Sequence, residues 1–325
     1  MPTETLEPVL AEFIFEKAPF RQCHASTLVE TADHDILASW FGGSAEGNPD
    51  VGIWLSRRHG DEWSSPRLVA DEPDVPCWNP VLFRLPEGGI WLFYKAGRDP
   101  CCWSGFYARS DDGGETWSEP TILPAGLLGP VKNKPISLST GEILFGTSVE
   151  SYRAWTSWVE KLSRDRSTWT RHGPIEYPGV SKGLIQPTLV ELSKGRIRAF
   201  MRSTHEIGSI CVSDSHDFGE TWSPARRTSL PNPNAGIDAV MTRSGLLVMV
   251  YNHSRTARTP LSIAVSEDGG ETWSAPLAVE TEPDRFSYPC VIQTSDGLVH
   301  AAYTWKRTRI KHVAFEEETL RSLLD

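Results

Sequence analysis

The amino-acid sequence predicts an all-β protein, a six-bladed β-propeller of four-stranded antiparallel blades. The first observation is composition: 13 Trp, 12 Phe and 7 Tyr accompany 26 Gly and 24 Pro in 325 residues, which favours short strands and tight turns over long helices. The second is a repeated motif, S-x-D-x-G-x-T-W, and the third is the regular spacing of its copies. We therefore treat residues 1–325 as one repeat domain.

The motif occurs in three full copies and two degenerate ones. The full copies begin at Ser110, Ser215 and Ser266, and SRRHGDEW and SRDRSTW fill the remaining places. The five copies end at tryptophans that lie 51 to 54 residues apart: Trp63, Trp117, Trp169, Trp222 and Trp273. Catalysis normally needs one constellation of residues, whereas architecture reuses parts, so we expect a structural turn. Its Asp accepts hydrogen bonds from turn amides and its Gly permits positive φ.

Each repeat unit shows the same order of apolar segments. The first strands are predicted in HASTLVET, NPVLFRLP, KPISLST, QPTLVELS, DAVMTRS and PCVIQTS, and a second apolar strand follows each of them. A third strand runs into the Asp-containing turn, and a short outer strand follows the tryptophan. Six such units form a propeller, because radial repetition protects the edges of the sheets.

The ring is predicted to close through its N-terminal segment. The sixth unit runs out near Asp325, where its own outer strand would be due. Residues 11–17, AEFIFEK, precede the first complete unit and can supply that strand. Pairing of the two terminal segments in one blade would lock the ring.

Charge and hydropathy restrict the class of partner. The formal net charge is −10, and no run of Lys and Arg stands out against it, so we expect no nucleic-acid or membrane partner. The sequence shows neither a signal peptide nor an apolar stretch of about twenty residues, and we expect a cytoplasmic location. The six cysteines lack metal-ligand spacing, so we expect mostly buried thiols, no metal and no cofactor. The oligomeric state stays open.

Function is expected at the mouth of the propeller, where inner strands begin and loops from several blades converge. Two stretches place polar residues just before apolar inner strands, where packing does not explain them. VKNKP contributes Lys132, Asn133 and Lys134, and NPNAGIDAV contributes Asn234 and Asp238. If Lys132 converged with arginines from other blades, an acidic protein would gain a local anion-binding site.

The repeated motif resembles the Asp-box of the sialidase, or neuraminidase, superfamily, and the similarity covers nearly the whole chain. The chain is similar in particular to bacterial sialidase-like proteins known as predicted neuraminidases. The resemblance implies that the box is a structural turn on the rim away from the catalytic cleft. It also implies a cleft with three arginines that hold a substrate carboxylate, an aspartate acid/base, and a tyrosine nucleophile paired with a glutamate, an exception among glycosidases.

Four residues of this chain match that family pattern. Arg202, which ends the strand RIRAFMRS, matches the second arginine, and Arg258 in RTARTPLSIAV matches the third. Tyr288 in FSYPC matches the nucleophile. Asp50 in GGSAEGNPDVGIW, with Glu46 close by, matches the acid/base.

Two positions depart from the family pattern. The spacing that the family requires puts His24 in the place of the first arginine, although Arg21 lies three residues earlier. Gln186 in LIQPTLVEL takes the place of the glutamate that activates the tyrosine, and an amide cannot accept a proton. The resemblance therefore supports the fold more strongly than it supports sialidase activity.

Three functions follow from these residues. An exo-acting glycosidase would hold a terminal acidic sugar with its arginines, attack with Tyr288 and donate a proton from Asp50. A uronate lyase would neutralise the carboxylate with Lys132 or the arginines and remove a proton with His24 or Tyr288; some sialidase-like propellers that act on rhamnose-glucuronate linkages use a histidine in this way. A non-catalytic propeller would bind a saccharide or a protein. We expect a carbohydrate-active enzyme with a small acidic saccharide as its partner, other than a conventional sialidase, and keep the binding propeller as the alternative.

Overall fold

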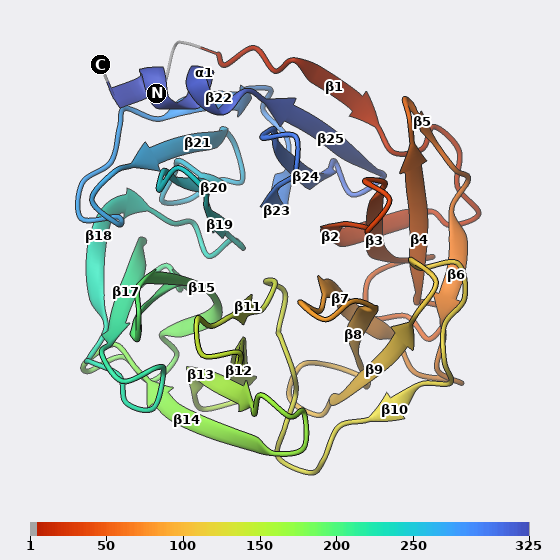
Figure 1. Ribbon diagram of the computed structural model, residues 1–325, viewed down its shortest axis with the longest axis horizontal. Coiled ribbons are helices and arrows are strands. Elements are labelled where there is room, and N and C mark those ends of the chain that lie inside the picture. The colour runs from red at the N-terminus through yellow and green to blue at the C-terminus, as the bar shows by residue number, and fades with distance from the viewer. Residues whose placement is uncertain (1–4, 325) are drawn as a thin grey trace.

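The computed structural model describes residues 5–324, which are nearly all β-strands and connecting loops. Six antiparallel sheets follow one another in chain order around a central axis (Figure 1). The structure confirms the six-bladed β-propeller predicted from the repeat. One short helical segment, α1 (Glu317–Arg321) with η1 (Ser322–Leu324), follows the last strand and was not predicted.

Each blade consists of consecutive strands of the chain, except the sixth, which also takes up the N-terminal strand. The first blade contains β2 (Gln22–Glu30), β3 (Ile36–Gly43) and β4 (Gly52–His59), with β5 (Glu62–Trp63) and β6 (Arg67–Ala70) sharing the outer place; the second contains β7 (Cys77–Arg84), β8 (Ile90–Ala96), β9 (Ser104–Ser110) and β10 (Thr121–Ile122). The third contains β11 (Ile136–Ser137), β12 (Ile143–Glu150), β13 (Trp155–Leu162) and β14 (Trp169–Ile175); the fourth contains β15 (Leu184–Ser193), β16 (Arg196–Ser203), β17 (Ser209–Ser215) and β18 (Arg226–Pro231). The fifth contains β19 (Asp238–Met241), β20 (Leu247–Asn252), β21 (Leu261–Ser266) and β22 (Leu277–Glu280); the sixth contains β23 (Phe286–Gln293), β24 (Val299–Trp305), β25 (Arg309–Phe315) and β1 (Leu10–Phe13).

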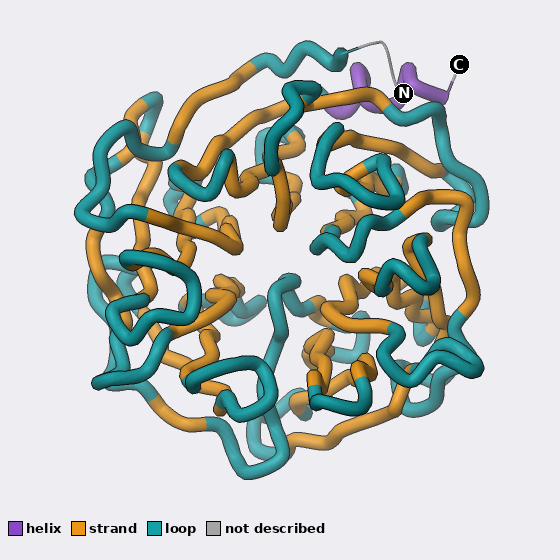
Figure 2. Tube along the Cα trace, turned by 180° about the vertical axis from the view of Figure 1, so that it is seen from behind, coloured by secondary structure: helices purple, strands orange, loops and turns teal. Residues whose placement is uncertain are grey.

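The N-terminal strand β1 closes the ring, as the sequence predicts. It pairs antiparallel with β25, from Leu10 opposite Ala314 to Phe13 opposite Lys311. In Figure 1 the red β1 lies beside the blue β25. The strand is shorter than the predicted segment 11–17 and begins one residue earlier. Figure 2 shows the helical segment, in purple, at the outer edge of the ring near this closure.

The full motif copies form one hydrogen-bonded turn between the third and fourth strands of their blades. In the copy of the fifth blade, the Ser266 hydroxyl accepts from the Gly270 N–H at 2.8 Å, and Asp268 accepts from the Thr272 N–H at 2.9 Å. The copies that begin at residues 110 and 215 repeat both contacts. The motif Asp therefore stabilises the turn through hydrogen bonds within it.

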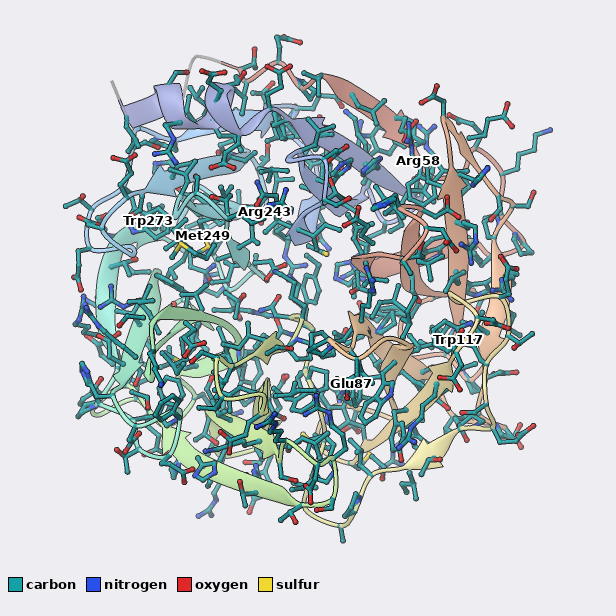
Figure 3. The ribbon with its side chains drawn as sticks, in the orientation of Figure 1. Arg58, Glu87, Trp117, Arg243, Met249 and Trp273 are labelled. Carbon is teal, nitrogen blue, oxygen red and sulfur yellow. The ribbon has the colours of Figure 1, made fainter. Side chains whose placement is uncertain are left out.

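The glycine of the motif also allows the turn to pack closely against the preceding blade. Gly270 has a φ of +92°, and a Cβ there would lie 2.6 Å from the ring of Phe200 in β16. The motif tryptophan Trp273 meets the same ring edge-on, with the centroids 5.8 Å apart. Figure 3 places the labelled Trp117 and Trp273 toward the rim of the ring.

Buried apolar residues fill the space between neighbouring blades, and each of the six contacts between blades has its own cluster. The cluster at the ring closure contains Ile14 and Phe15 beside Trp40 and Ile292. This packing makes a rigid frame, on which the loops at the mouth are positioned.

Two further expectations concern the cysteines and the membrane. Four of the six cysteines are buried, as expected, whereas Cys101 and Cys102 are exposed in the loop after β8. Within residues 5–324, no helix combines the length and the apolar composition needed to cross a bilayer.

Candidate functional site

Four inner strands carry the same irregularity near their first residues. The pairing of β2, β7, β15 and β23 with the next strand shifts register there. The shifted segments contain residues with positive φ: Ala25 at 61°, Asn79 at 42°, Gln186 at 55° and Tyr288 at 55°. This conformation is uncommon for residues other than glycine and clusters at functional sites. A bulge re-aims the side chain that it carries, and here it brings Gln186 and Tyr288 together.

Tyr288 lies at the centre of the candidate site. Nη1 of Arg202 donates to its hydroxyl oxygen at 2.6 Å, and Nε2 of Gln186 donates to the same oxygen at 3.3 Å. Nη1 of Arg202 also donates to Oε1 of Gln186 at 3.1 Å. Because arginine only donates, the amide oxygen must face Arg202 and the amide NH2 must face Tyr288. The phenol oxygen therefore accepts two hydrogen bonds, which leaves its own proton for a third group.

Two arginines lie near the Tyr288 ring. The guanidinium carbons of Arg202 and Arg258 each lie 5.7 Å from the ring centroid. Asn234 joins them, because its Oδ1 accepts from Nε of Arg202 at 2.8 Å and its backbone oxygen accepts from Nη2 of Arg258 at 3.5 Å. Arg202 is 7% exposed, and burial lowers the pKa of Arg258.

The acceptors that these two arginines find within residues 5–324 are all uncharged. Glu150 is near enough for the charge of Arg202 to oppose the rise of its pKa, but within residues 5–324 neither arginine forms an ion pair with a carboxylate. A buried cation without a paired carboxylate is costly. Arg202 and Arg258 are therefore a ready pair of donors for an anion, and a guanidinium fork suits a carboxylate.

His24 packs against the ring of Tyr288. Its ring centroid is 4.1 Å from that of Tyr288, and the residue is 1% exposed. Its Nδ1 meets Oγ1 of Thr304 at 2.8 Å, and that oxygen already accepts the Ala25 N–H at 3.2 Å. The Thr304 hydroxyl can donate to Nδ1 or accept from it, and Nε2 is buried with no hydrogen-bond partner among residues 5–324. Burial and the nearby cations, Arg307 foremost, hold the pKa of His24 well below its usual value.

Lys132 is close to the site but has no N–H left for a ligand. Its Nζ donates to Oδ1 of Asn133 and to the backbone oxygen of Ile237, both at 2.8 Å, and to the backbone oxygen of Pro289. An ammonium has three N–H groups, and all three are used. Nδ2 of Asn133 in turn donates to the backbone oxygen of Gln186 at 2.9 Å. This geometry favours a structural role for Lys132 and Asn133, below the site, over direct ligand binding.

Asp238 is likewise satisfied inside the protein. It is 1% exposed and accepts from Nζ of Lys134, from Oγ1 of Thr188 and from the N–H of Val291. These contacts join the third, fourth, fifth and sixth blades. The geometry therefore assigns Asp238 to the frame that holds the site.

Asp50 lies apart from the residues around Tyr288, in the exposed loop between β3 and β4. We call the group formed by Gln186, Arg202, Asn234, Arg258 and Tyr288 the Tyr288 cluster. The Asp50 carboxylate accepts from the N–H and the hydroxyl of Ser44, both at 2.8 Å, and so braces its own loop. Glu46 in the same loop pairs with Arg307 at 2.7 Å. The structure thus places the loop beside the site without bringing Asp50 into contact with Tyr288.

Sequence reasoning missed two residues at this end of the propeller. Arg307 lies in the turn between β24 and β25, and Glu150 ends β12. Burial raises the pKa of Glu150, and the charge of Arg202 counteracts that rise. The signal was available: Asp50, Arg202 and these two residues all stand at the end of a second strand or in the turn that follows it.

A cleft of about 660 Å³ opens beside Arg258. Its walls come from the fourth, fifth and sixth blades and are formed by His205, Pro233, Asn234, Thr256, Ala257, Arg258, Thr259, Pro283, Asp284, Arg285 and Arg307. Since Asn234 and Arg258 also contact Arg202 or Tyr288, the cleft adjoins the group of residues around Tyr288.

The chemistry available at the site follows from these contacts. Two guanidiniums can bind an oxyanion, and the Tyr288 hydroxyl can donate a hydrogen bond or a proton to it or beside it. Position 186 supplies a donor to the phenol and no proton acceptor. The site thus offers two guanidiniums to a ligand, and within residues 5–324 no carboxylate makes a hydrogen bond to the Tyr288 hydroxyl.

Comparison with known proteins places the chain in a family. The family described as BNR repeat-like domain matches residues 34–301. A sialidase of Bacteroides fragilis is 22% identical over 318 residues, which cover 85% of this chain and 57% of that protein. A sialidase of Micromonospora viridifaciens is 27% identical over 321 residues, which cover 85% of this chain and 48% of that protein. The chain thus spans about half the length of these relatives.

Solved structures share the architecture. The Hadza microbial sialidase Hz136 superposes with a TM-score of 0.78 at 21% identity, over 91% of this chain and 66% of that one. Identity at this level shows the fold alone. The motif repeat, the propeller and the family match agree: this chain belongs to the family of BNR repeat-like domains and is a sialidase-like β-propeller protein.

Proposed function

We propose that this chain is a carbohydrate-active enzyme that acts on the terminal acidic sugar of a small saccharide and holds the sugar carboxylate between Arg202 and Arg258. The observation that carries the proposal is the pair of guanidiniums near Tyr288, buried at Arg202 and partly buried at Arg258, which find only uncharged hydrogen-bond acceptors within residues 5–324. The relatives named sialidases support an acidic sugar as the ligand.

The proposed enzyme is not a conventional sialidase, because of Gln186. A glutamate there would accept the proton of Tyr288, whereas the amide donates to the phenol oxygen and accepts only from Arg202. Tyr288 then offers its own proton to the sugar and acts as a proton donor in place of a nucleophile. His24 supports the Tyr288 ring from the buried side. Asp50 and Glu150 are two carboxyls at this end of the propeller that can take part as acid or base.

Product analysis on defined saccharides tests the proposal. Purified protein is incubated with a fluorogenic sialoside and with glucuronate-capped and galacturonate-capped oligosaccharides, and released sugars are separated by chromatography. Elimination is distinguished from hydrolysis by the ultraviolet absorbance of its unsaturated product. We expect cleavage of a uronate-capped substrate and a loss of about 100-fold or more in Tyr288→Phe, the scale of a lost proton donor. Tyr107→Phe is the control, because Tyr107 lies in β9 of the second blade and its hydroxyl accepts from Arg109 of the same strand.

Release of free sialic acid by the wild-type protein, abolished in Tyr288→Phe, would show a conventional sialidase and overturn the proposed mechanism. The alternative function is a non-catalytic propeller, which the missing carboxylate at position 186 favours, since a binding site needs the arginines and not the nucleophile. Binding of an acidic saccharide without any product, with unchanged affinity in Asp50→Asn and His24→Ala, would establish that alternative.

A further inference from the structure

The cleft beside Arg258 carries more positive charge than one sugar carboxylate needs. Arg258, Arg285 and Arg307 line it, and Asp284 is the acidic residue of its wall. Asp284 already lies 3.7 Å from Nζ of Lys306. The arginines are therefore in excess locally, in a chain whose formal net charge is −10.

Two of these arginines belong to the sixth blade and stand beyond the Tyr288 cluster. Arg285 immediately precedes β23, and Arg307 occupies the tight turn between β24 and β25. Arg285 is exposed, whereas the side chain of Arg307 is 22% exposed and pairs with Glu46 at 2.7 Å. Arg255, which lies in the same loop as Arg258, is exposed and does not line the cleft. The positive charge of the cleft is thus contributed by particular turns of the fifth and sixth blades.

The cleft and the Tyr288 cluster share a wall. Asn234 binds Arg202 through its side chain and Arg258 through its backbone, and Asn234 and Arg258 both line the cleft. The cleft, of about 660 Å³, is therefore next to the proposed carboxylate site and can receive the rest of a ligand held there, since its size is in the range of small-molecule sites.

We propose that Arg285 and Arg307 bind a second anionic group, a carboxylate or a sulfate, on the same saccharide whose first carboxylate lies between Arg202 and Arg258. The proposal rests on the proposed function and names its substrate class: an oligosaccharide with two anionic groups near its end. Both oxyanions match the planar fork of a guanidinium. On binding, the second anion takes over the place of the Glu46 carboxylate at Arg307.

Calorimetry with defined probes tests this second subsite. The probes are galacturonic acid, which carries one carboxylate, digalacturonic acid, which carries two, and the disaccharide of chondroitin 4-sulfate, which carries a carboxylate and a sulfate. We expect the wild-type protein to bind one of the two-anion probes at least about 10-fold more tightly than galacturonic acid, a typical difference for one charge-assisted contact. Comparison of the two disaccharides tells whether the second group is a carboxylate or a sulfate.

Matched variants separate this subsite from the primary one. Arg285→Gln and Arg307→Gln should each weaken the two-anion probe about 5-fold or more and leave galacturonic acid within about twofold. Arg255→Gln is the control and should change neither. Glu46→Gln should bind the two-anion probe at least as tightly as wild type, because the competing carboxylate is gone. Melting temperatures verify that the variants are folded.

Two results would overturn the second subsite. One is equal affinity of the wild-type protein for all three probes, and the other is a preference for two anions that persists in both Arg285→Gln and Arg307→Gln. Failure of the proposed function looks different, because galacturonic acid would then bind equally well to wild type and Arg258→Gln. If no probe binds to the wild-type protein, the proposed carboxylate site and the second subsite that rests on it are both contradicted.

Discussion

Arg202 donates a hydrogen bond of 2.6 Å to the hydroxyl oxygen of Tyr288, across the mouth of the propeller from the fourth blade to the sixth. Gln186 donates to the same oxygen and accepts from the same arginine. The three side chains form a closed triangle in which the phenol oxygen only accepts. The direction of these bonds, more than the identity of any one residue, separates this site from one with a tyrosine and a glutamate.

Reversing the hydrogen bond between position 186 and Tyr288 should lower turnover. In Gln186→Glu, the new carboxylate can accept from both Arg202 and the Tyr288 hydroxyl, which draws the phenol proton away from the sugar. We expect kcat on the substrate of the wild-type protein to fall about 10-fold or more. Steady-state kinetics of the single variants and of Gln186→Glu with Tyr288→Phe form a double-mutant cycle, in which the two losses should not add. Fully additive losses would mean that the two residues act independently.

Ring closure should depend on the buried face of the N-terminal segment. Ile14 is 2% exposed in the cluster that joins the first and sixth blades, whereas Val9 is 56% exposed. We expect Ile14→Ala to lower the free energy of unfolding by about 2 to 5 kcal/mol and Val9→Ala by less than about 0.5 kcal/mol. Urea unfolding measures both. Equal effects would show that the N-terminal segment does not close the ring, and deletion of residues 1–17 should lower the melting temperature further than Ile14→Ala does.

The same closure should weaken in acid. Nδ1 of His300 meets Nε2 of His312 at 2.9 Å, so both rings cannot be fully protonated, and His312 reaches Glu12 of β1 at 2.9 Å. Burial and the charge of His312 lower the pKa of His300 to about 4, and burial lowers the pKa of His312. A histidine whose folded pKa is depressed stabilises the fold above its unfolded value of about 6.5 and loses that contribution as pH falls toward the folded value.

Glu12 adds to this acid sensitivity at lower pH. Burial raises its pKa, but hydrogen bonds from His312 and Trp63 and the charge of Arg58 outweigh burial and lower the pKa to about 2. Its stabilisation is therefore present above the usual value of about 4.5 and is lost as pH falls toward 2. Thermal melts between about pH 7.5 and 4.5 should show a smaller decrease for His300→Phe than for wild type. Replacing the exposed His216 with Gln should leave the pH dependence unchanged, and an identical decrease in all three proteins would contradict the role of His300.

The motif turns should affect stability and leave binding unchanged. Asp112 accepts from the Thr116 hydroxyl at 2.5 Å, from the Thr116 N–H at 2.9 Å and from the Ser110 hydroxyl at 2.7 Å, and these hydrogen bonds hold its pKa below its usual value. The neighbouring Asp111 is exposed and serves as the matched control. We expect Asp112→Ala to lower the melting temperature by a few degrees, Asp111→Ala to leave it unchanged, and both to bind galacturonic acid as wild type does. Loss of binding in Asp112→Ala alone would reopen a functional role for the motif.

The fold was predictable because its signals are local and repeated. The motif tryptophans fix the period, the turn residues fix the strand ends, and a segment such as AEFIFEK stands where the ring needs an outer strand. The limits of single strands were less predictable. KPISLST forms only the two-residue strand β11 (Ile136–Ser137), because the preceding chain from Pro130 to Lys134 is bound to neighbouring blades through side chains and loop contacts.

The site was predictable in part, since counting from the inner strands identified Gln186, Arg202, Arg258 and Tyr288, which the structure brings together. The sequence shows that Lys132 and Asp238 are polar, but it does not show that buried acceptors and donors from other blades satisfy them. Those partners are far away along the chain: Ile237 lies 105 residues from Lys132, and Val291 lies 53 residues from Asp238.

Arg307 and Glu150 were not predicted from the sequence for a different reason. Arg307 and Glu150 follow or end second strands, in turns that carry no motif of their own. Their proximity to the site depends on how six blades converge, which is a property of the closed ring. The turn that holds Arg307 is equivalent to the one that holds Asp50, so the position of Asp50 in the repeat also points to Arg307.

Binding of an acidic sugar compared with its methyl ester is the decisive measurement for the carboxylate site. Calorimetry is carried out with galacturonic acid and N-acetylneuraminic acid, each against its ester, on wild type and Arg202→Gln. For at least one sugar, we expect the wild-type protein to bind the acid about 10-fold or more tightly than the ester. In Arg202→Gln, we expect the acid and the ester to bind with about equal affinity. Equal affinity of the wild-type protein for acid and ester of both sugars would refute the claim that Arg202 and Arg258 hold a carboxylate.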